Sequence, residues 1–229
     1  YKIALSFYYQ ELYDKAAQTL DYLIENPSDK VPVSSIYNLL GYVYMGKKDH
    51  LKAANILEYA LYITPYNYKL LAAQGRAYLE LNELEKAEIA IKKAIFCAPT
   101  YQYAHFLLGN LYLKQGKIIP AILAYNYVAF LDPKSDQSIE SLQALNNLFV
   151  GFTEIVDNET NNANITDKMR EEDERFQILE QLVGNNIAMT KKFKLKSKID
   201  HIIIRQSQLV MENLPVSNAS VLNFIFKVF

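Results

Sequence analysis

Four kinds of residue recur three times in the middle of this chain, each at intervals of 34 positions. They are a glycine (Gly41, Gly75 and Gly109), a tyrosine (Tyr44, Tyr78 and Tyr112), an alanine (Ala53, Ala87 and Ala121) and a proline (Pro65, Pro99 and Pro133). A period of this length with a small residue, an aromatic residue and a closing proline is typical of a helix–turn–helix repeat. The sequence therefore predicts a stacked array of helix pairs.

Each recurring residue type has a physical role in such a pair. Gly41 and Ala53 fall on consecutive helices, and their small side chains let those helices approach closely. Tyr44 lies on the same helical face as Gly41 and can fill the volume between helices. Pro65 cannot continue a helix, so it ends the second helix and separates one copy from the next.

The pattern resembles the tetratricopeptide repeat (TPR). The first copy carries all of the family's residues: Tyr37, Leu40, Gly41, Tyr44, Ala53, Leu57, Ala60 and Pro65. The second copy departs at Gln74, a polar residue at an inward-facing position, and the third copy departs at His105 and Val128. The resemblance implies an all-α helical solenoid of antiparallel helix pairs, in which each repeat buries its apolar face against its neighbours.

The frame also predicts how the chain is organised. The expected segments are a TPR array over 1–135 (a truncated repeat 1–30, then repeats 34–67, 68–101 and 102–135), a capping helix over 136–156, a flexible loop over 157–167 and a C-terminal helical segment over 168–229. The loop is expected because residues 157–167 are almost entirely polar. A capping helix meets the need of a solenoid to cover its last apolar face.

Composition excludes several classes of protein. The net charge of −1 gives no overall electrostatic attraction to nucleic acid or to an anionic membrane. Apolar runs are far shorter than the roughly 20 residues that span a bilayer, so we expect no membrane insertion. Cys97 is the only cysteine, which favours a reducing compartment and a cytoplasmic location. Because the chain opens on Tyr1, inside an expected helix, we interpret it as a fragment.

In the TPR family, the first helix of each repeat lines a concave groove that holds extended or helical peptides. The resemblance implies a groove lined by Tyr8, Tyr9, Asn38, Tyr42, Met45, Lys69, Arg76, Tyr103, Phe106, Asn110 and Lys114. Aromatic side chains provide a large contact area at low entropic cost. The cations among these residues could bind carboxylates, and the asparagines could bond a peptide backbone.

This groove predicts another protein as the partner, in the form of an acidic or carboxylate-ended peptide or a helix. The co-chaperone subgroup of the family grips a C-terminal carboxylate with a lysine and an arginine. Lys69 matches that lysine, but Ala73 stands at the arginine position, which argues against binding of a chaperone tail.

Nothing in the sequence indicates an enzyme. The three histidines are scattered, and no Gly-rich phosphate loop, HExxH motif or Cys/His cluster is present. We therefore expect no catalytic residues, no cofactor and no metal site. The acidic run Glu171–Glu174 is expected to be the solvated start of a helix.

Three functions remain open. The chain is a protein-interaction module or scaffold subunit of a larger assembly, or it is a mainly structural solenoid whose groove its own C-terminal segment fills. A third possibility is a regulatory TPR part of a larger enzyme. The apolar segment 221–229 separates the first two, because it must pack either on this chain or on a partner. The lysine-rich run 191–198 is expected to be a solvated face.

Overall fold

The structure is a computed structural model that describes residues 1–27, 30–157, 183, 194 and 201–213. Within these residues the regular secondary structure is entirely helical, which confirms the predicted all-α class. The chain divides into two compact units, residues 1–107 and 108–229, and the division falls inside helix α7 (Gln102–Lys114). Residues 158–167 of the predicted loop and the apolar segment 221–229 lie outside the described residues, as does most of 168–200.

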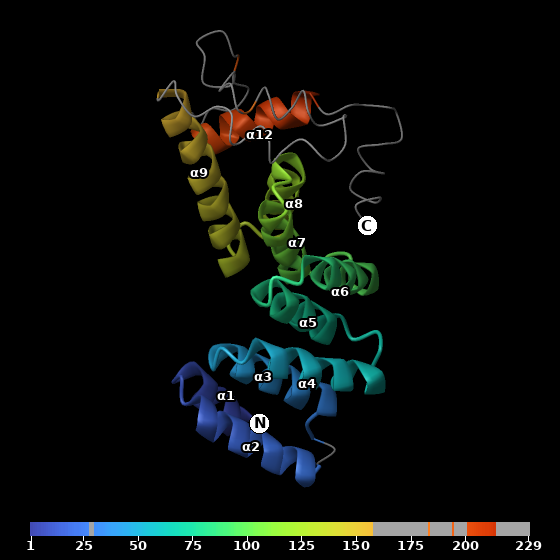
Figure 1. The fold of residues 1–229 in the computed structure, drawn as a ribbon. Helices are drawn as coiled ribbons and strands as arrows, with labels where there is room; N and C mark the ends of the chain where they lie inside the picture. Colours follow the sequence, from blue (N-terminus) through green and yellow to red (C-terminus); the bar gives the residue numbers. More distant parts are fainter. Residues whose placement is uncertain (28–29, 158–182, 184–193, 195–200, 214–229) are drawn as a thin grey trace. The chain divides into compact units, whose positions relative to one another are not determined.

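The first unit is built from successive helix pairs. The pairs are α1 (Lys2–Tyr9) with α2 (Tyr13–Glu25), α3 (Val33–Gly46) with α4 (His50–Ile63), and α5 (Tyr68–Glu80) with α6 (Leu84–Cys97). Each helix contacts the next one along the chain, and α3 also contacts α5 (Figure 1). Short turns join the two helices of a pair and force them to run antiparallel. This arrangement confirms the predicted repeat.

The turns inside the pairs share one backbone feature. Lys48 and Asn82 have φ angles of 61° and 59°, in the left-handed region that non-glycine residues rarely enter. Gly116 stands at the matching position of the next repeat and has a φ of 76°. A left-handed residue directly after a helix is a common way to end it, and here the ending recurs with the period of the repeat.

The recurring glycines mark the contact between the two helices of each repeat. A β-carbon built at these positions would lie 2.8 Å from Leu57 Cδ2 at Gly41, 2.6 Å from Ile91 Cγ1 at Gly75 and 2.5 Å from Tyr125 Cε1 at Gly109. Each partner residue follows its glycine at the same spacing, on the second helix. All three partner side chains are fully buried. The glycines are thus required by packing between helices.

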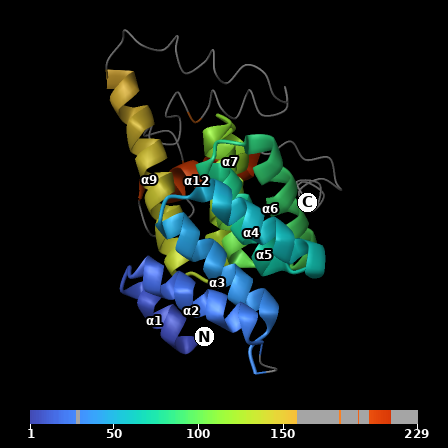
Figure 2. The same cartoon turned by 60° about the horizontal axis from the view of Figure 1, so that its bottom comes forward.

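The described part of the second unit contains α8 (Ile118–Leu131), α9 (Asp136–Asp157) and α12 (Ile202–Asn213). Helix α9 begins where the repeat pattern ends, and it packs against α8 and α12. Figure 2 shows α12 beside α9. The Ser207 hydroxyl of α12 donates a hydrogen bond of 3.1 Å to the side-chain oxygen of Asn126 on α8. Among the described residues, no helix has the length and apolar character needed to cross a membrane.

Candidate functional site

Four side chains from the first helices of successive repeats form a connected row in the first unit. Tyr42 and Arg76 occupy the same position of the repeat frame on α3 and α5, while Tyr8 comes from α1 and Tyr103 from α7. The ring centroids of Tyr8 and Tyr42 lie 6.5 Å apart in an edge-to-face arrangement. Arg76 continues the row, with its guanidinium carbon 5.9 Å from the centroid of the Tyr42 ring. We call these four residues the tyrosine–arginine ladder.

Tyrosines hold the guanidinium of Arg76 without neutralising it. Its Nη1 donates a hydrogen bond of 3.3 Å to the hydroxyl of Tyr103, and its face lies against Tyr42. The side chain is partly buried, yet it makes no ion pair with any carboxylate in the described part of the chain. A desolvated guanidinium that lacks an anion can bind a carboxylate in bidentate fashion.

The phenols of Tyr42 and Tyr101 stay neutral at physiological pH. Burial raises the pKa of Tyr42 far above its ordinary value, and the neighbouring Tyr103 and Tyr101 raise it further. Burial likewise raises the pKa of Tyr101 to about 12, with smaller contributions from Tyr103 and Tyr68. The neutral phenol of Tyr42, next to Arg76, can donate a hydrogen bond to a bound acceptor.

The structure brings several other predicted groove residues near the ladder or to the surface. Phe106 stacks on Tyr103 at 6.4 Å between ring centroids, and Tyr9 is exposed next to Tyr8 at 5.6 Å. Asn38 has a buried side-chain oxygen with no hydrogen-bond partner among the described residues. Lys69 is exposed.

Other predicted groove residues are placed differently. Met45 is only 7% exposed and belongs to the hydrophobic core, so it offers little surface to a ligand. Asn110 and Lys114 belong to the second unit. The side-chain oxygen of Asn110 accepts a hydrogen bond of 2.6 Å from the hydroxyl of the buried Tyr125. Some of the residues predicted to line the groove therefore take part in packing between helices instead.

Sequence reasoning missed Tyr68 and Tyr101. Their rings meet edge-to-face at 4.7 Å, and Tyr101 also lies 6.2 Å from Tyr103. The signal available in the sequence was the position of Tyr101, shortly before Tyr103 and just after a repeat-closing proline. These tyrosines extend the aromatic surface next to the ladder.

His105 has a structural role. It is 1% exposed, and its Nε2 lies 2.7 Å from the carbonyl oxygen of Pro99. Because a carbonyl oxygen can only accept, Nε2 carries the proton and donates it in this bond. Burial lowers the pKa of His105, although the bond to Pro99 opposes that effect, so the imidazole is neutral at pH 7. No group of three or more His, Cys, Asp or Glu residues suited to a metal occurs within the described residues.

Comparison with solved structures assigns the fold to a class of proteins. A thermophilic TPR protein from Thermus thermophilus is similar, with a TM-score of 0.55 and 17% identity over 73% of this chain and 94% of its own. A TPR protein from Parabacteroides merdae matches 99% of this chain and 96% of its own, with a TM-score of 0.50 and 14% identity. The chain is therefore a TPR-type helical repeat protein.

A family model narrows the assignment. The chain belongs to the ChAPs family (Chs5p-Arf1p-binding proteins), whose model matches residues 6–203. No curated protein sequence matches the chain.

Proposed function

We propose that this chain is a scaffold subunit that binds a segment of a protein partner through the tyrosine–arginine ladder. The observation that carries the proposal is Arg76, a partly buried cation bound by tyrosines and without a carboxylate in the described residues. The ligand we infer is an acidic side chain or a terminal carboxylate on an extended or helical segment. Tyr8, Tyr42 and Tyr103 would contribute contact area and hydrogen bonds to it.

The family suggests which partners to test. Its description names proteins that bind Chs5p and Arf1p, so we infer that this chain binds one or both. The TPR fold and this family are those of interaction scaffolds, which favours binding over catalysis as the function. The cytoplasmic location inferred from the single cysteine remains part of the proposal.

The test measures binding of the 229-residue chain to purified Chs5p and, separately, to purified Arf1p by biolayer interferometry at two salt concentrations. We expect Arg76→Glu to weaken binding to at least one of them about tenfold or more, which corresponds to ~1.4 kcal/mol. The salt dependence of binding should also become weaker, because a cation has been replaced by an anion. Tyr103→Phe, which removes only the hydroxyl that holds Arg76, should have a smaller effect in the same direction.

The matched control is Lys134→Glu, an equal charge reversal at an exposed lysine of the second unit. It should leave both affinities unchanged. Circular dichroism melting identifies any variant that fails to fold, and Tyr103→Phe then carries the test alone. If the folded Arg76→Glu variant binds as tightly as the wild type, the ladder is not the binding site. If the wild type binds neither protein, the inferred partner class is wrong.

A further inference from the structure

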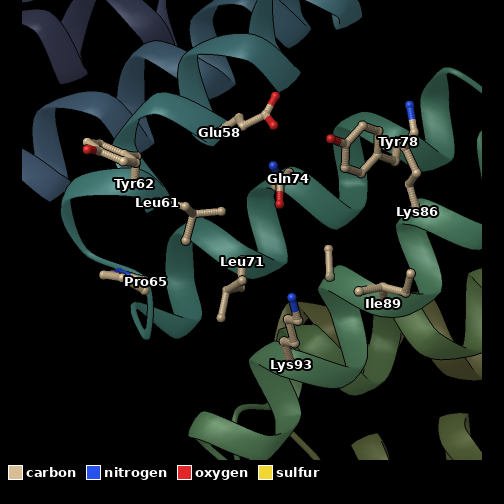
Figure 3. A pocket seen from close by; sticks show the side chains of 11 residues that line it. Glu58, Leu61, Tyr62, Pro65, Leu71, Gln74, Tyr78, Lys86, Ile89 and Lys93 are labelled. Atoms are coloured by element: carbon tan, nitrogen blue, oxygen red, sulfur yellow. The ribbon is translucent and has the colours of Figure 1, made fainter.

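A second candidate binding site lies between three helices of the first unit. Side chains from α4, α5 and α6 line a surface pocket of about 450 Å³. Figure 3 shows α5 contributing Leu71, Gln74 and Tyr78, with Glu58 on α4 and Lys93 on α6. None of the residues of the tyrosine–arginine ladder lines this pocket.

The preceding repeat shows why the pocket is open. At its equivalent positions, Tyr37 stands in place of Leu71 and Tyr59 in place of Lys93. The rings of Tyr37 and Tyr59 meet edge-to-face at 5.6 Å between centroids. In the pocket, Leu71 and Lys93 replace this aromatic pair, so no contact between two rings covers the pocket.

Gln74 places an unpartnered amide in the pocket wall. It is 9% exposed, and in the described part of the chain its side chain makes no hydrogen bond. The matching positions of the first and third copies hold the buried Leu40 and Leu108, so the repeat does not require a polar group here. Solvent reaches the Gln74 amide through the pocket, so a ligand with a donor and an acceptor can bond it directly. A peptide group has both.

The rim of the pocket carries charges of both signs. Glu58 on α4 and Lys93 on α6 make no ion pair within the described residues. The other lysine of the pocket, Lys86, is bound to Glu83 at 2.6 Å. In the view of Figure 3, Gln74 lies between Glu58 and Lys93. This arrangement is complementary to a ligand that is basic at one end and acidic at the other.

We propose that this pocket binds a short extended segment of a partner protein. A leucine-sized apolar side chain of that segment enters beside Leu71 and Ala90, and the peptide group next to it bonds the Gln74 amide. A basic residue on one side of the apolar residue faces Glu58, and an acidic residue on the other side faces Lys93. The proposal is independent of the function assigned to the ladder.

The pocket and the ladder can be occupied at the same time. Gln74 and Arg76 are separated by a single residue on α5, so their side chains point about 200° apart around the helix axis. A substitution at one of them therefore leaves the other binding face in place. A scaffold with both sites would bind two peptide segments, one on each side of α5.

The probes are two short capped peptides, Ac-Lys-Leu-Glu-NH₂ and its reverse Ac-Glu-Leu-Lys-NH₂, because the segment can run in either direction. Each is titrated into the 229-residue chain labelled with ¹⁵N, and the side-chain amide signal of Gln74 is followed by NMR. The signal is assigned by its loss in the Gln74→Leu variant. We expect one of the two peptides to shift it saturably, with signals from Leu71 and Ala90 moving together with it.

Two matched changes sharpen the test. An analogue N-methylated at leucine lacks the peptide N–H and should bind about tenfold more weakly. Gln74→Leu should weaken binding of the unmethylated peptide by about the same factor. It should also raise the melting temperature, because the buried leucines Leu40 and Leu108 fill the same position in the other copies of the repeat. Ala90→Ile, which restores the Ile56 of the preceding repeat, should reduce binding by filling the pocket.

Three results would overturn the proposal. The first is that neither peptide shifts the Gln74 signal at millimolar concentration. The second is equal affinity of the N-methylated and unmethylated peptides, which would show that the site binds the apolar side chain and not the peptide group. The third is a lowered melting temperature for Gln74→Leu, which would give the amide a structural role in the repeat. Because neither Chs5p nor Arf1p is used as a probe, these results are separate from a failure of the function proposed for the ladder.

Discussion

Gly75 shows how much a single missing side chain contributes to this fold. A β-carbon there would lie 2.6 Å from Cγ1 of Ile91, a side chain that is fully buried. Helix α5 or α6 would have to move to admit it, and a packed interior transmits such a movement to its neighbours. Gly75 also lies between Gln74 and Arg76, so its close contact positions both proposed binding residues.

We predict that Gly75→Leu destabilises the protein by about 1–3 kcal/mol, because it overpacks the contact with Ile91. The measurement is the urea midpoint of unfolding, followed by circular dichroism. Glu80→Leu, which adds the same side chain at an exposed position at the end of α5, is the control and should change the midpoint little. An unchanged midpoint for Gly75→Leu would contradict the role of glycine in this repeat.

At the scale of one element, α5 is the helix on which both proposed sites depend. Its N-terminus is capped by Asn67, whose side-chain oxygen accepts hydrogen bonds from the backbone N–H of Lys69 at 3.1 Å and of Leu70 at 3.3 Å. Helix α3, the first helix of the preceding repeat, begins after Pro32 and has no side-chain cap. The first turn of α5 thus depends on one residue for the donors that the helix itself cannot satisfy.

We predict that Asn67→Ala lowers the free energy of unfolding by about 1 kcal/mol, the usual cost of losing an N-cap. Asn67→Asp should retain most of the stability, because aspartate accepts the same bonds and its charge suits the N-terminus of a helix. Asn55→Ala, at an exposed position inside α4, controls for removal of an asparagine and should cost much less. Equal losses for the alanine variants at 67 and 55 would show that the cap does not stabilise α5.

At the scale of the whole molecule, the chain divides into two compact units, residues 1–107 and 108–229. The first unit carries both proposed binding sites, and the second carries α8, α9 and α12. The apolar segment 221–229 lies outside the described residues, so its packing on this chain or on a partner stays a prediction. A run of this composition left in water would be a large apolar patch and an aggregation hazard.

We predict that residues 215–229 pack on helices within residues 136–211, so that deleting them exposes apolar faces and lowers solubility. Size-exclusion chromatography with light scattering compares the truncated and full chains, and interferometry compares their binding to Chs5p and Arf1p. A soluble monomer that no longer binds would instead identify the segment as an interface with a partner. A soluble monomer with full binding would show it to be dispensable.

The repeat architecture could be predicted from the sequence because its signals are local. The glycine and the side chain that packs over it lie on adjacent helices joined by a short turn, and their spacing in the sequence recurs in each copy. The prolines and left-handed turn residues likewise act close to their own position in the chain. A periodic pattern of this kind specifies helix pairs and their stacking without knowledge of distant contacts.

Only the tertiary structure decided which side chains are available to a ligand. Met45 was predicted in the groove but is buried in the core, and Gln74, which is buried as its inward position predicts, also lines a pocket. The bond from Arg76 to Tyr103 joins two repeats. Each of these outcomes depends on how side chains from several helices pack together. That packing cannot be predicted from any one stretch of the sequence.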